Sequence, residues 1–269
     1  PDIEQRLWEL SDSMNALGVK VDVDLVNSAL AIDDESSDRL IKRAKEVTGI
    51  DNPKSTSQVI HWLQERVDGV ENTNKETVAS LLSRDDIPGD VREFLKIRQE
   101  LAKASISKYK AMDICKGSGD RVRGLLQVYG ANRTGRWAGR LVQVQNLPRN
   151  YLDNLETIRD VIKTKNLDLL QLVCGNASDT LSQLIRTAFI PTEGNKFVVA
   201  DYSAIEARVV AWLAGEEWVN KVFATHGKIY EATASQMFGV PFELIKKGNP
   251  EYELRQRGKV ATLALGYQG

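Results

Sequence analysis

The spacing of apolar residues changes twice along this chain, and this change restricts the fold more than any other feature of the sequence. From Ile3 to Met112, apolar side chains recur every three or four positions, as on amphipathic helices. From Leu125 they occur in short runs typical of strands, and from Tyr151 the helical spacing returns. Separate blocks of helices, sheet and helices are typical of the α+β class. We therefore predict an α+β fold with two lobes.

Local signals predict where the elements begin and end. Gly18 and Gly49 follow helical runs and are expected to end them, and Thr73-x-x-Glu76 has the spacing of a capping box. The predicted helices cover residues 3–17, 24–47 with an interruption near 33–37, 56–67, 76–82, 89–112, 151–165, 167–173, 181–185, 205–215, 217–225, 229–238 and 250–267. The predicted strands cover residues 125–129, 141–144, 187–190 and 196–200. The last two are expected to form a hairpin across the turn 191–195.

The composition is typical of a globular protein and excludes a disordered or fibrous one. Hydrophobic residues make up 42% of the chain, and 36 Lys and Arg residues nearly balance 37 Asp and Glu residues. The longest clean apolar run, 209–215, is far shorter than the ~20 residues of a membrane-spanning helix, so no membrane partner is expected. Cysteines and histidines are scattered singly, which predicts neither a zinc site nor a disulfide framework and fits a reducing cytoplasm.

One segment carries a strong local charge. Residues 101–149 contain ten Lys and Arg residues against two Asp residues, a net charge of +8. Such a segment attracts a polyanion through phosphate contacts and the release of counterions, and it predicts a nucleic-acid surface. The solvated face of a helical protein explains the same charge equally well, and both interpretations stay open at this point.

Two further patterns carry chemistry. The predicted strand 196–200 delivers Asp201 directly before a helix, where a metal-binding carboxylate would be held rigidly. Ser203-x-x-Glu206 also has capping-box spacing, which would make Glu206 a device for starting the helix. In the last helix, four residues follow one another at four-residue steps, a pattern that can hold phosphates at one end and a base or sugar at the other. These residues are Arg255, Lys259, Leu263 and Tyr267. An ordinary amphipathic helix with an exposed basic stripe explains the same spacing, and both interpretations stay open here.

Together the motifs resemble family A DNA polymerases, the polymerase I type, and in particular the phage-type members. Asp-Tyr-Ser-x-Ile-Glu-x-Arg at 201–208 and Arg-x-x-x-Lys at 255–259 are similar to motifs A and B of that family. Thr-Gly-Arg at 134–136, Gln-Asn-Leu-Pro at 145–148 and Ile-Arg-x-Ala-Phe at 185–189 match its upstream signatures in the expected order. The resemblance covers nearly the whole chain. It implies a mostly helical thumb and fingers around a partial antiparallel palm sheet.

The resemblance implies a DNA-directed DNA polymerase that transfers nucleotides from dNTPs to a primer 3′-hydroxyl with two Mg²⁺ ions. Asp201 and the Tyr202 carbonyl would bind the ions. Arg255 and Lys259 would hold the triphosphate, and Glu206 would exclude a 2′-hydroxyl. Further substrate-binding residues by this resemblance are Leu263, Tyr267, Arg186 and Tyr230. Leu263 replaces a residue that is usually aromatic in the family, and Tyr230 replaces a common histidine.

The resemblance also implies contacts to primer-template DNA. Arg136 would reach the minor groove at the primer terminus, where the acceptors are shared by all base pairs. The other DNA-binding residues expected are Thr134, Gln145, Asn146, Lys103, Lys108 and Lys110. A cytoplasmic location, in a bacterial or phage-infected cell, follows from this interpretation.

The domains expected from the resemblance are a helix leading into the palm (1–21), a thumb (22–110), a palm with motif A (111–215) and fingers that stop at motif B (216–269). A third motif, a His-Asp-Glu-type turn with the second metal-binding Asp, does not occur in the 269 residues. We therefore expect an incomplete polymerase that is inactive by itself, which a second polypeptide or a further C-terminal part would complete. The alternative is a non-catalytic nucleic-acid-binding module that retains vestigial polymerase motifs.

Overall fold

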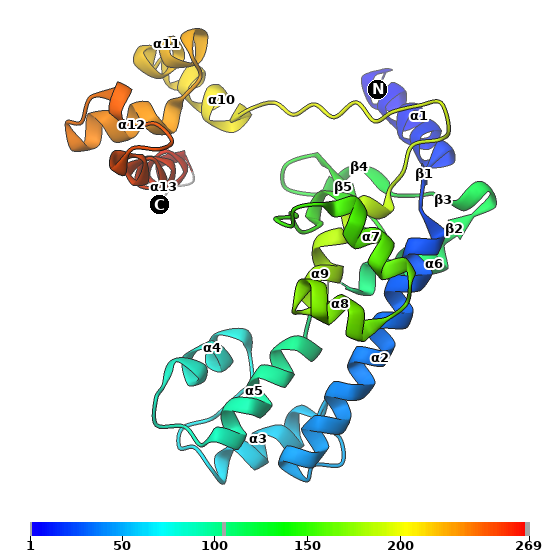
Figure 1. The fold of residues 1–269 in the computed structure, drawn as a ribbon. Helices are drawn as coiled ribbons and strands as arrows, with labels where there is room; N and C mark the ends of the chain where they lie inside the picture. Colours follow the sequence, from blue (N-terminus) through cyan, green and yellow to red (C-terminus); the bar gives the residue numbers. More distant parts are fainter. Residues whose placement is uncertain (1, 104–105, 267–269) are drawn as a thin grey trace. The chain divides into compact units, whose positions relative to one another are not determined.

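The computed structural model describes residues 2–103 and 106–266 and separates into two compact units, 1–196 and 197–269 (Figure 1). Helices predominate, and the strands form two small antiparallel sheets, which confirms the predicted α+β class. Within the described residues, no helix is both long and apolar enough to cross a bilayer.

Unit 1 begins with helix α1 (Asp2–Leu17), which ends at Gly18 as predicted. A three-stranded antiparallel sheet follows in the order β1 (Val19–Lys20), β3 (Arg121–Val122), β2 (Lys116–Gly117). Arg121 donates from Nε to the Leu17 carbonyl at 2.6 Å, and Arg123 donates from Nε to the Ala16 carbonyl at 2.9 Å. Both bonds satisfy carbonyls that a helix end leaves open. Two arginines of the +8 segment therefore form hydrogen bonds within the protein.

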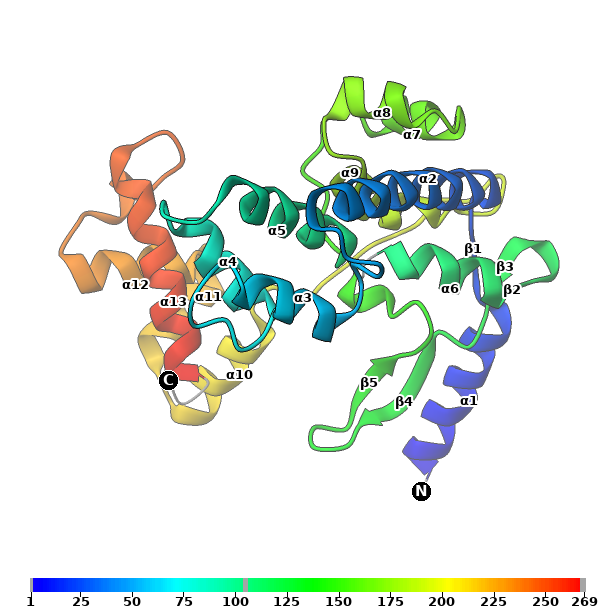
Figure 2. The same cartoon turned by 90° about the horizontal axis from the view of Figure 1, so that it is seen from below.

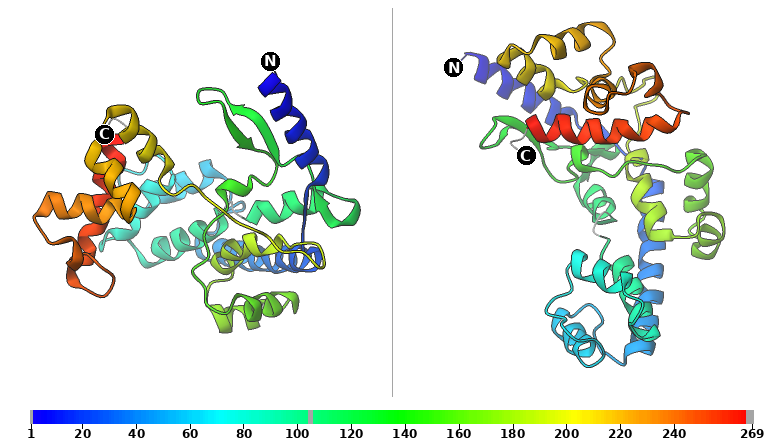
Figure 3. Two further views of the ribbon diagram at one scale, coloured as in Figure 1. Left: turned by 90° about the horizontal axis from the view of Figure 1, so that it is seen from above. Right: turned by 90° about the vertical axis from the view of Figure 1, so that its left-hand side faces the viewer.

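Helix α2 (Val23–Thr48) extends from one hydrophobic core of unit 1 to the other (Figures 1 and 3). Its first residues are capped by Asp22, whose carboxylate accepts from the Leu25 N–H at 3.0 Å, and Gly49 ends it at φ +70°. The predicted interruption near 33–37 is wrong. The buried face continues through Ile32 and Ser36, so packing against other helices keeps this stretch helical.

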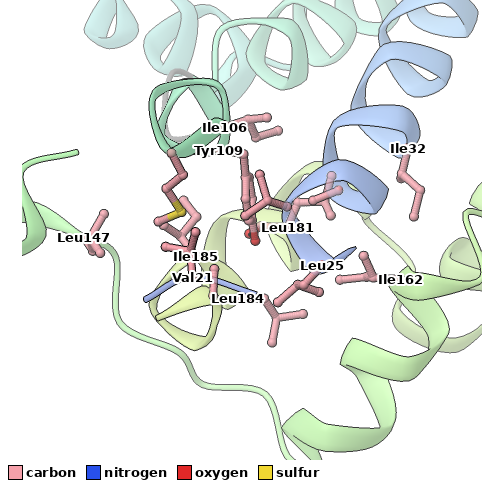
Figure 4. Close-up of a cluster of buried hydrophobic side chains, with 14 of the residues drawn as sticks. Val21, Leu25, Ile32, Ile106, Tyr109, Leu147, Ile162, Leu181, Leu184 and Ile185 are labelled. Atoms are coloured by element: carbon pink, nitrogen blue, oxygen red, sulfur yellow. The ribbon is translucent and has the colours of Figure 1, made fainter. Parts of the chain in front are cut away.

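The first core surrounds the N-terminal half of α2. It contains side chains from α6 (Ser107–Cys115), α7 (Leu155–Lys163), α8 (Leu167–Cys174) and α9 (Ala177–Leu184), as Figure 4 shows in part. Tyr109 is fully buried here, and its hydroxyl donates to the Leu181 carbonyl at 2.9 Å. Burial raises the pKa of Tyr109, because the phenolate would lose its hydration.

The second core surrounds the C-terminal half of α2 and contains α3 (Thr56–Gln64), α4 (Lys75–Ser83) and α5 (Gly89–Leu101). Trp62 and Phe94 meet edge to face at 5.2 Å. Asn74 caps α4 by accepting from the Thr77 N–H at 2.8 Å, so the predicted capping box at residues 73–76 is wrong. The single helix predicted over 89–112 is also wrong. Helix α5 packs in the second core and α6 in the first, so the chain must leave one core to enter the other.

A two-stranded hairpin of β4 (Leu126–Ala131) and β5 (Arg136–Gly139) lies beside α1 (Figure 2). Asn15 joins them, because its side-chain amide donates to the Leu126 carbonyl at 2.7 Å and accepts from the Leu126 N–H at 2.9 Å. The strand predicted over 141–144 is wrong. Leu141 and Gln143 take φ values of +54° and +55°, in the left-handed region rather than the extended region of regular strands, and a short 3₁₀ helix, η3 (Val144–Asn146), follows.

The hairpin predicted over 187–200 is wrong as well. Residues 185–188 form a 3₁₀ helix, η4 (Ile185–Ala188), and Phe189 pairs with Val21 instead. The Ile190 N–H donates to the Lys20 carbonyl at 3.0 Å, so the N-terminal strand takes the place of the expected partner. Residues 196–200 are extended without a partner strand among the described residues, and Val199 is 90% exposed. A strand forms only where neighbouring backbone satisfies its N–H and C=O groups.

Unit 2 is helical from residue 205 onward. Its elements are α10 (Ile205–Ala214), α11 (Glu217–Thr225), α12 (Ile229–Phe238), η5 (Phe242–Leu244), η6 (Pro250–Glu253) and α13 (Leu254–Gly266). Helices α12 and α13 approach closely at Gly258, where an added Cβ would lie 2.2 Å from the Tyr230 carbonyl oxygen. Only glycine permits that distance.

An ionic cluster joins the start of α2 to α7 in unit 1. Asp22, 12% exposed, accepts from Arg159 at 2.6 Å and from Lys163 at 2.8 Å, and Arg159 also donates to the Thr187 carbonyl. Partial burial by itself would raise the pKa of Asp22. The Lys163 ammonium, the Leu25 N–H and the Arg159 charge outweigh that effect, so the pKa is lowered from its ordinary value.

Asp22→Asn is therefore expected to destabilise the chain at pH 7 by about 2 kcal/mol, the size of a lost charge-assisted hydrogen bond. Because the folded-state pKa is lowered, the carboxylate contributes fully above its ordinary pKa of ~3.9, and the contribution disappears as pH falls through the folded-state value. Urea unfolding at pH 7 and pH 3 measures the difference. Asp24→Asn is the control, since Asp24 is 65% exposed and 3.9 Å from Lys163. An equal loss in both variants would contradict the assignment.

Candidate functional site

The motif that contains Asp201 lies at the start of unit 2. Asp201 and Tyr202 are exposed and lie outside any helix or strand, and α10 begins after Ala204, which takes φ +51°. Ala204 has no side chain that can cap, so the capping-box interpretation of Glu206 is wrong. Arg208 donates from Nε to the Ser203 carbonyl at 2.8 Å, and its guanidinium lies 4.2 Å from the centre of the Phe223 ring. These two contacts hold the turn that leads from Asp201 into the helix.

A cavity of about 320 Å³ in unit 2 brings together two predicted substrate-binding residues from different motifs. Glu206 of α10 and Leu263 of α13 both line it. The rest of the wall is mainly apolar and includes Val210, Trp218 and Ile229. A mostly apolar cavity whose lining also includes the two acids Glu206 and Glu216 is suited to a small ligand that has a flat apolar part and a polar part.

The predicted phosphate-binding residues lie on α13. Arg255 donates from Nε to Glu231 Oε1 of α12 at 2.8 Å, and its guanidinium lies 5.3 Å from the Tyr230 ring centre and 5.9 Å from that of Tyr252. Lys259 lies one turn further along the same helix and is partly exposed. The structure thus brings the predicted residues Tyr230 and Arg255 together. Tyr267 lies outside the described residues.

The described residues do not make up a metal site. Asp201 and the Tyr202 carbonyl are oxygen ligands of the kind that Mg²⁺ prefers. However, in residues 2–103 and 106–266 no three His, Cys, Asp or Glu side chains lie close enough to hold an ion together. One carboxylate and one carbonyl do not balance the charge of two divalent ions.

In unit 1, several of the predicted DNA-binding residues lie on or beside the β4–β5 hairpin. The hydroxyl of Thr134 accepts from the Arg136 N–H at 3.4 Å in the turn, and the Arg136 side chain is exposed. Gln145 packs against β5, since a Cβ added at Gly139 would lie 2.1 Å from its Oε1. Asn146 is exposed beside it. Thr134 and Arg136 therefore lie at the turn of the hairpin, and Gln145 lies against the end of β5.

Of the predicted lysines, Lys103 follows α5, whereas Lys108 and Lys110 lie on α6. Lys103 and Lys110 line a polar cavity of about 200 Å³ together with Lys54 and Asp33. Burial raises the pKa of Asp33, although the Lys110 charge opposes that effect. Lys103 also lies 3.6 Å from Asp179. The charge of this cluster is therefore partly neutralised within the protein.

On α6, Lys108 precedes the buried Tyr109 and Lys110 follows it. The Lys108 side chain is half-buried. Arg186 donates from Nε to the Pro148 carbonyl at 2.9 Å and from Nη2 to the Leu147 carbonyl at 2.7 Å. In this structure Arg186 therefore fixes the segment that follows Gln145 and Asn146. The family resemblance implied that Arg186 binds substrate. The contact with Leu147 and Pro148 could not be predicted, because these carbonyls are distant from Arg186 in sequence.

Two residues that position predicted site residues were missed. Glu231 pairs with Arg255, and the two are too far apart in sequence for any spacing rule to link them. Arg208 belongs to the quoted motif, but only the fold shows that it holds the Ser203 turn. The one signal in the sequence that could have pointed to Glu231 is that this acid directly follows Tyr230, a predicted substrate-binding residue.

The sequence pattern of DNA polymerase family A matches residues 31–268. The chain is 53% identical over 266 residues to the DNA polymerase of Bacillus phage SP02, an alignment that covers 99% of this chain and 40% of the phage protein. It is 51% identical over 65 residues to the thermostable DNA polymerase I of Thermus aquaticus, which covers 24% of this chain and 8% of that protein. The chain thus spans two fifths of the length of the phage relative and much less of the other.

A solved structure has a similar fold. It is the POL domain of Pol1 from M. smegmatis in complex with DNA primer-template and dNTP, with a TM-score of 0.62 and 21% sequence identity. The match covers 93% of this chain and 40% of that one. The family pattern and the phage relative confirm the resemblance read from the motifs at 134–136, 201–208 and 255–259, and this chain belongs to the family A DNA polymerases.

Proposed function

We propose that this chain supplies the primer-template surface and the nucleotide-binding helix of a DNA-directed DNA polymerase. The observation that carries the proposal is the cavity of unit 2, which Glu206 of one motif and Leu263 of the other both line. In template-directed nucleotidyl transfer, the primer 3′-hydroxyl attacks the α-phosphate of a dNTP and pyrophosphate leaves. Arg255 and Lys259 hold the triphosphate on α13, and the Lys259 side chain is placed to donate a proton to the departing pyrophosphate.

Asp201 contributes one carboxylate to the proposed site, and the Tyr202 carbonyl a second oxygen. Because the described residues complete no metal site, we derive no step through Mg²⁺ for this chain. Arg136, Thr134, Gln145 and Asn146 bind the DNA backbone and minor groove on unit 1, while the lysines add phosphate contacts. The division of the chain into thumb, palm and fingers, with the boundaries predicted from the sequence, is part of this proposal.

DNA binding is the first test of the proposed function. The chain is expected to bind primer-template duplex with equal affinity for unrelated sequences, because backbone and minor-groove contacts do not read the bases. About four phosphate contacts predict roughly a hundredfold loss of affinity between 50 and 200 mM salt. Fluorescence anisotropy of labelled duplexes at both salt concentrations measures this. Affinity that does not change with salt, or no binding at 50 mM, would refute the proposed primer-template surface.

Glu206→Ala tests the nucleotide part. The side chain lines the cavity, so its removal is expected to reduce the preference of the chain for dATP over ATP by about tenfold, because space opens for the 2′-hydroxyl. Titration of both nucleotides by isothermal calorimetry gives the ratio of dissociation constants. Glu216→Ala is the control, since Glu216 lines the same cavity but belongs to neither motif. If the two variants change the ratio equally, Glu206 does not act as the sugar gate.

A further inference from the structure

The guanidinium of Arg255 contacts the side chains of Glu231, Tyr230 and Tyr252. Glu231 Oε1 accepts from Nε at 2.8 Å, and the rings of Tyr230 and Tyr252 lie 5.3 Å and 5.9 Å from the guanidinium carbon. Glu231 is only 13% exposed, whereas Arg255 is 32% exposed. The Glu231 side chain is therefore mostly buried, whereas that of Arg255 is partly exposed. A mostly buried carboxylate is tolerated because it is paired with a cation.

The position of the contact on the guanidinium matters for ligand binding. Nε carries one N–H, and the terminal nitrogens Nη1 and Nη2 carry the remaining four. Among residues 2–103 and 106–266, no hydrogen-bond acceptor or acid contacts Nη1 or Nη2 of Arg255. The paired terminal nitrogens form the fork that binds a phosphate with two parallel hydrogen bonds.

The elements that carry the pair are also held together. Helix α13 meets α12 at Gly258, and beyond it the Thr262 hydroxyl donates to the Thr233 hydroxyl at 3.1 Å. Glu231 of α12 and Arg255 of α13 form their ion pair across the same two helices. A carboxylate on a fixed helix restricts the long arginine side chain, which otherwise loses rotamer entropy when it binds a ligand.

We propose that Glu231 is a positioning residue for triphosphate binding, which holds Nε of Arg255 so that the Nη1 and Nη2 fork faces the nucleotide phosphates. The proposal rests on the proposed role of Arg255 in binding the triphosphate. Glu231 touches no phosphate itself. A carboxylate that competed with phosphate would occupy the fork, whereas this one bonds Nε and leaves the fork for the ligand. The ligand class is a nucleoside triphosphate or another linear polyphosphate.

Calorimetric titration of the full chain with dATP and with inorganic tripolyphosphate tests this role. Glu231→Gln keeps the shape but removes the charge, and it is expected to weaken both ligands about fivefold, through loss of one charge-assisted hydrogen bond to the arginine. Glu253→Gln is the matched control. Glu253 is exposed two residues before Arg255 and forms no ion pair with it in the described part of the chain, so its loss should leave both affinities unchanged.

A double-mutant cycle separates positioning from general stability. Arg255→Ala is expected to weaken both ligands tenfold or more, and Glu231→Gln added to it should cause no further change. Glu231→Asp keeps the carboxylate and should retain more affinity than Glu231→Gln, even if both lower the thermal unfolding midpoint. Unchanged or tighter binding by Glu231→Gln, or an equal further loss in the Arg255→Ala background, would overturn the positioning role. If Arg255→Ala binds both ligands normally, the proposed phosphate role of Arg255 fails instead.

Discussion

Residues 1–269 alone are expected to extend a primer no faster than a protein-free control. Two Mg²⁺ ions around a reacting phosphate need at least two well-placed carboxylates, and the described residues group no set of metal-binding side chains around Asp201. The undescribed residues, 1, 104–105 and 267–269, include no acid. A missing metal ligand removes several kcal/mol of transition-state stabilisation, which is a loss on the order of a thousandfold or more.

Primer extension with a labelled primer on a denaturing gel measures this expectation. Addition of a polypeptide that carries the family's His-Asp-Glu-type turn should restore extension if the two parts assemble. The restored activity should disappear with Asp201→Ala and persist with Glu193→Ala, which removes the acid of the preceding turn. Robust extension by residues 1–269 alone, free of host polymerase, would show that Asp201 does not need a second carboxylate from elsewhere.

Gly258→Val is expected to disrupt the packing of α12 against α13. Its Cβ would lie 2.2 Å from the Tyr230 carbonyl oxygen and 2.9 Å from the Ala234 backbone nitrogen. Backbone atoms cannot move aside as a flexible side chain can, so the helices must separate, at a cost of about 4 kcal/mol or more. Gly258→Ala should cost about 2 kcal/mol, because the same clash outweighs the ~1 kcal/mol that alanine gains in a helix.

Hydrogen exchange read by mass spectrometry localises the effect. Amides of residues 229–238 and 254–266 should lose protection in Gly258→Val, while those of α2 and α5 in unit 1 should not. The control is Gly89→Ala, because no atom lies within 4 Å of its added Cβ and its φ is not positive. Normal protection of α12 and α13 in Gly258→Val would contradict the close approach.

Much of the helical structure could be predicted because the information is local. Gly18 and Gly49 end their helices in left-handed conformation, where glycine has no Cβ to clash. The motif residues were also recognisable, since each lies within a short segment of the chain. Glu206 and Leu263 were assigned to one substrate, and they line one cavity.

Strand pairing was predicted poorly because a strand depends on a partner that local sequence does not name. Residues 196–200 have the composition of a strand, yet no strand pairs with them in the described residues, while Phe189 pairs with Val21 from the other end of unit 1. The same limit applies to charges. Arg121 and Arg123 were counted in a surface for DNA, but both satisfy carbonyls at the end of α1.

The sequence by itself determined the family, the α+β class, most helix positions and the identity of the motif residues, since these depend on spacing along the chain. Only the tertiary structure decided which Lys and Arg side chains bond to groups of the protein itself, and that Glu231 pairs with Arg255. It also decided that glycine is required at position 258. The physical reason is that hydrogen bonds, ion pairs and steric contacts depend on distances in space, and those distances join residues that the chain order keeps apart.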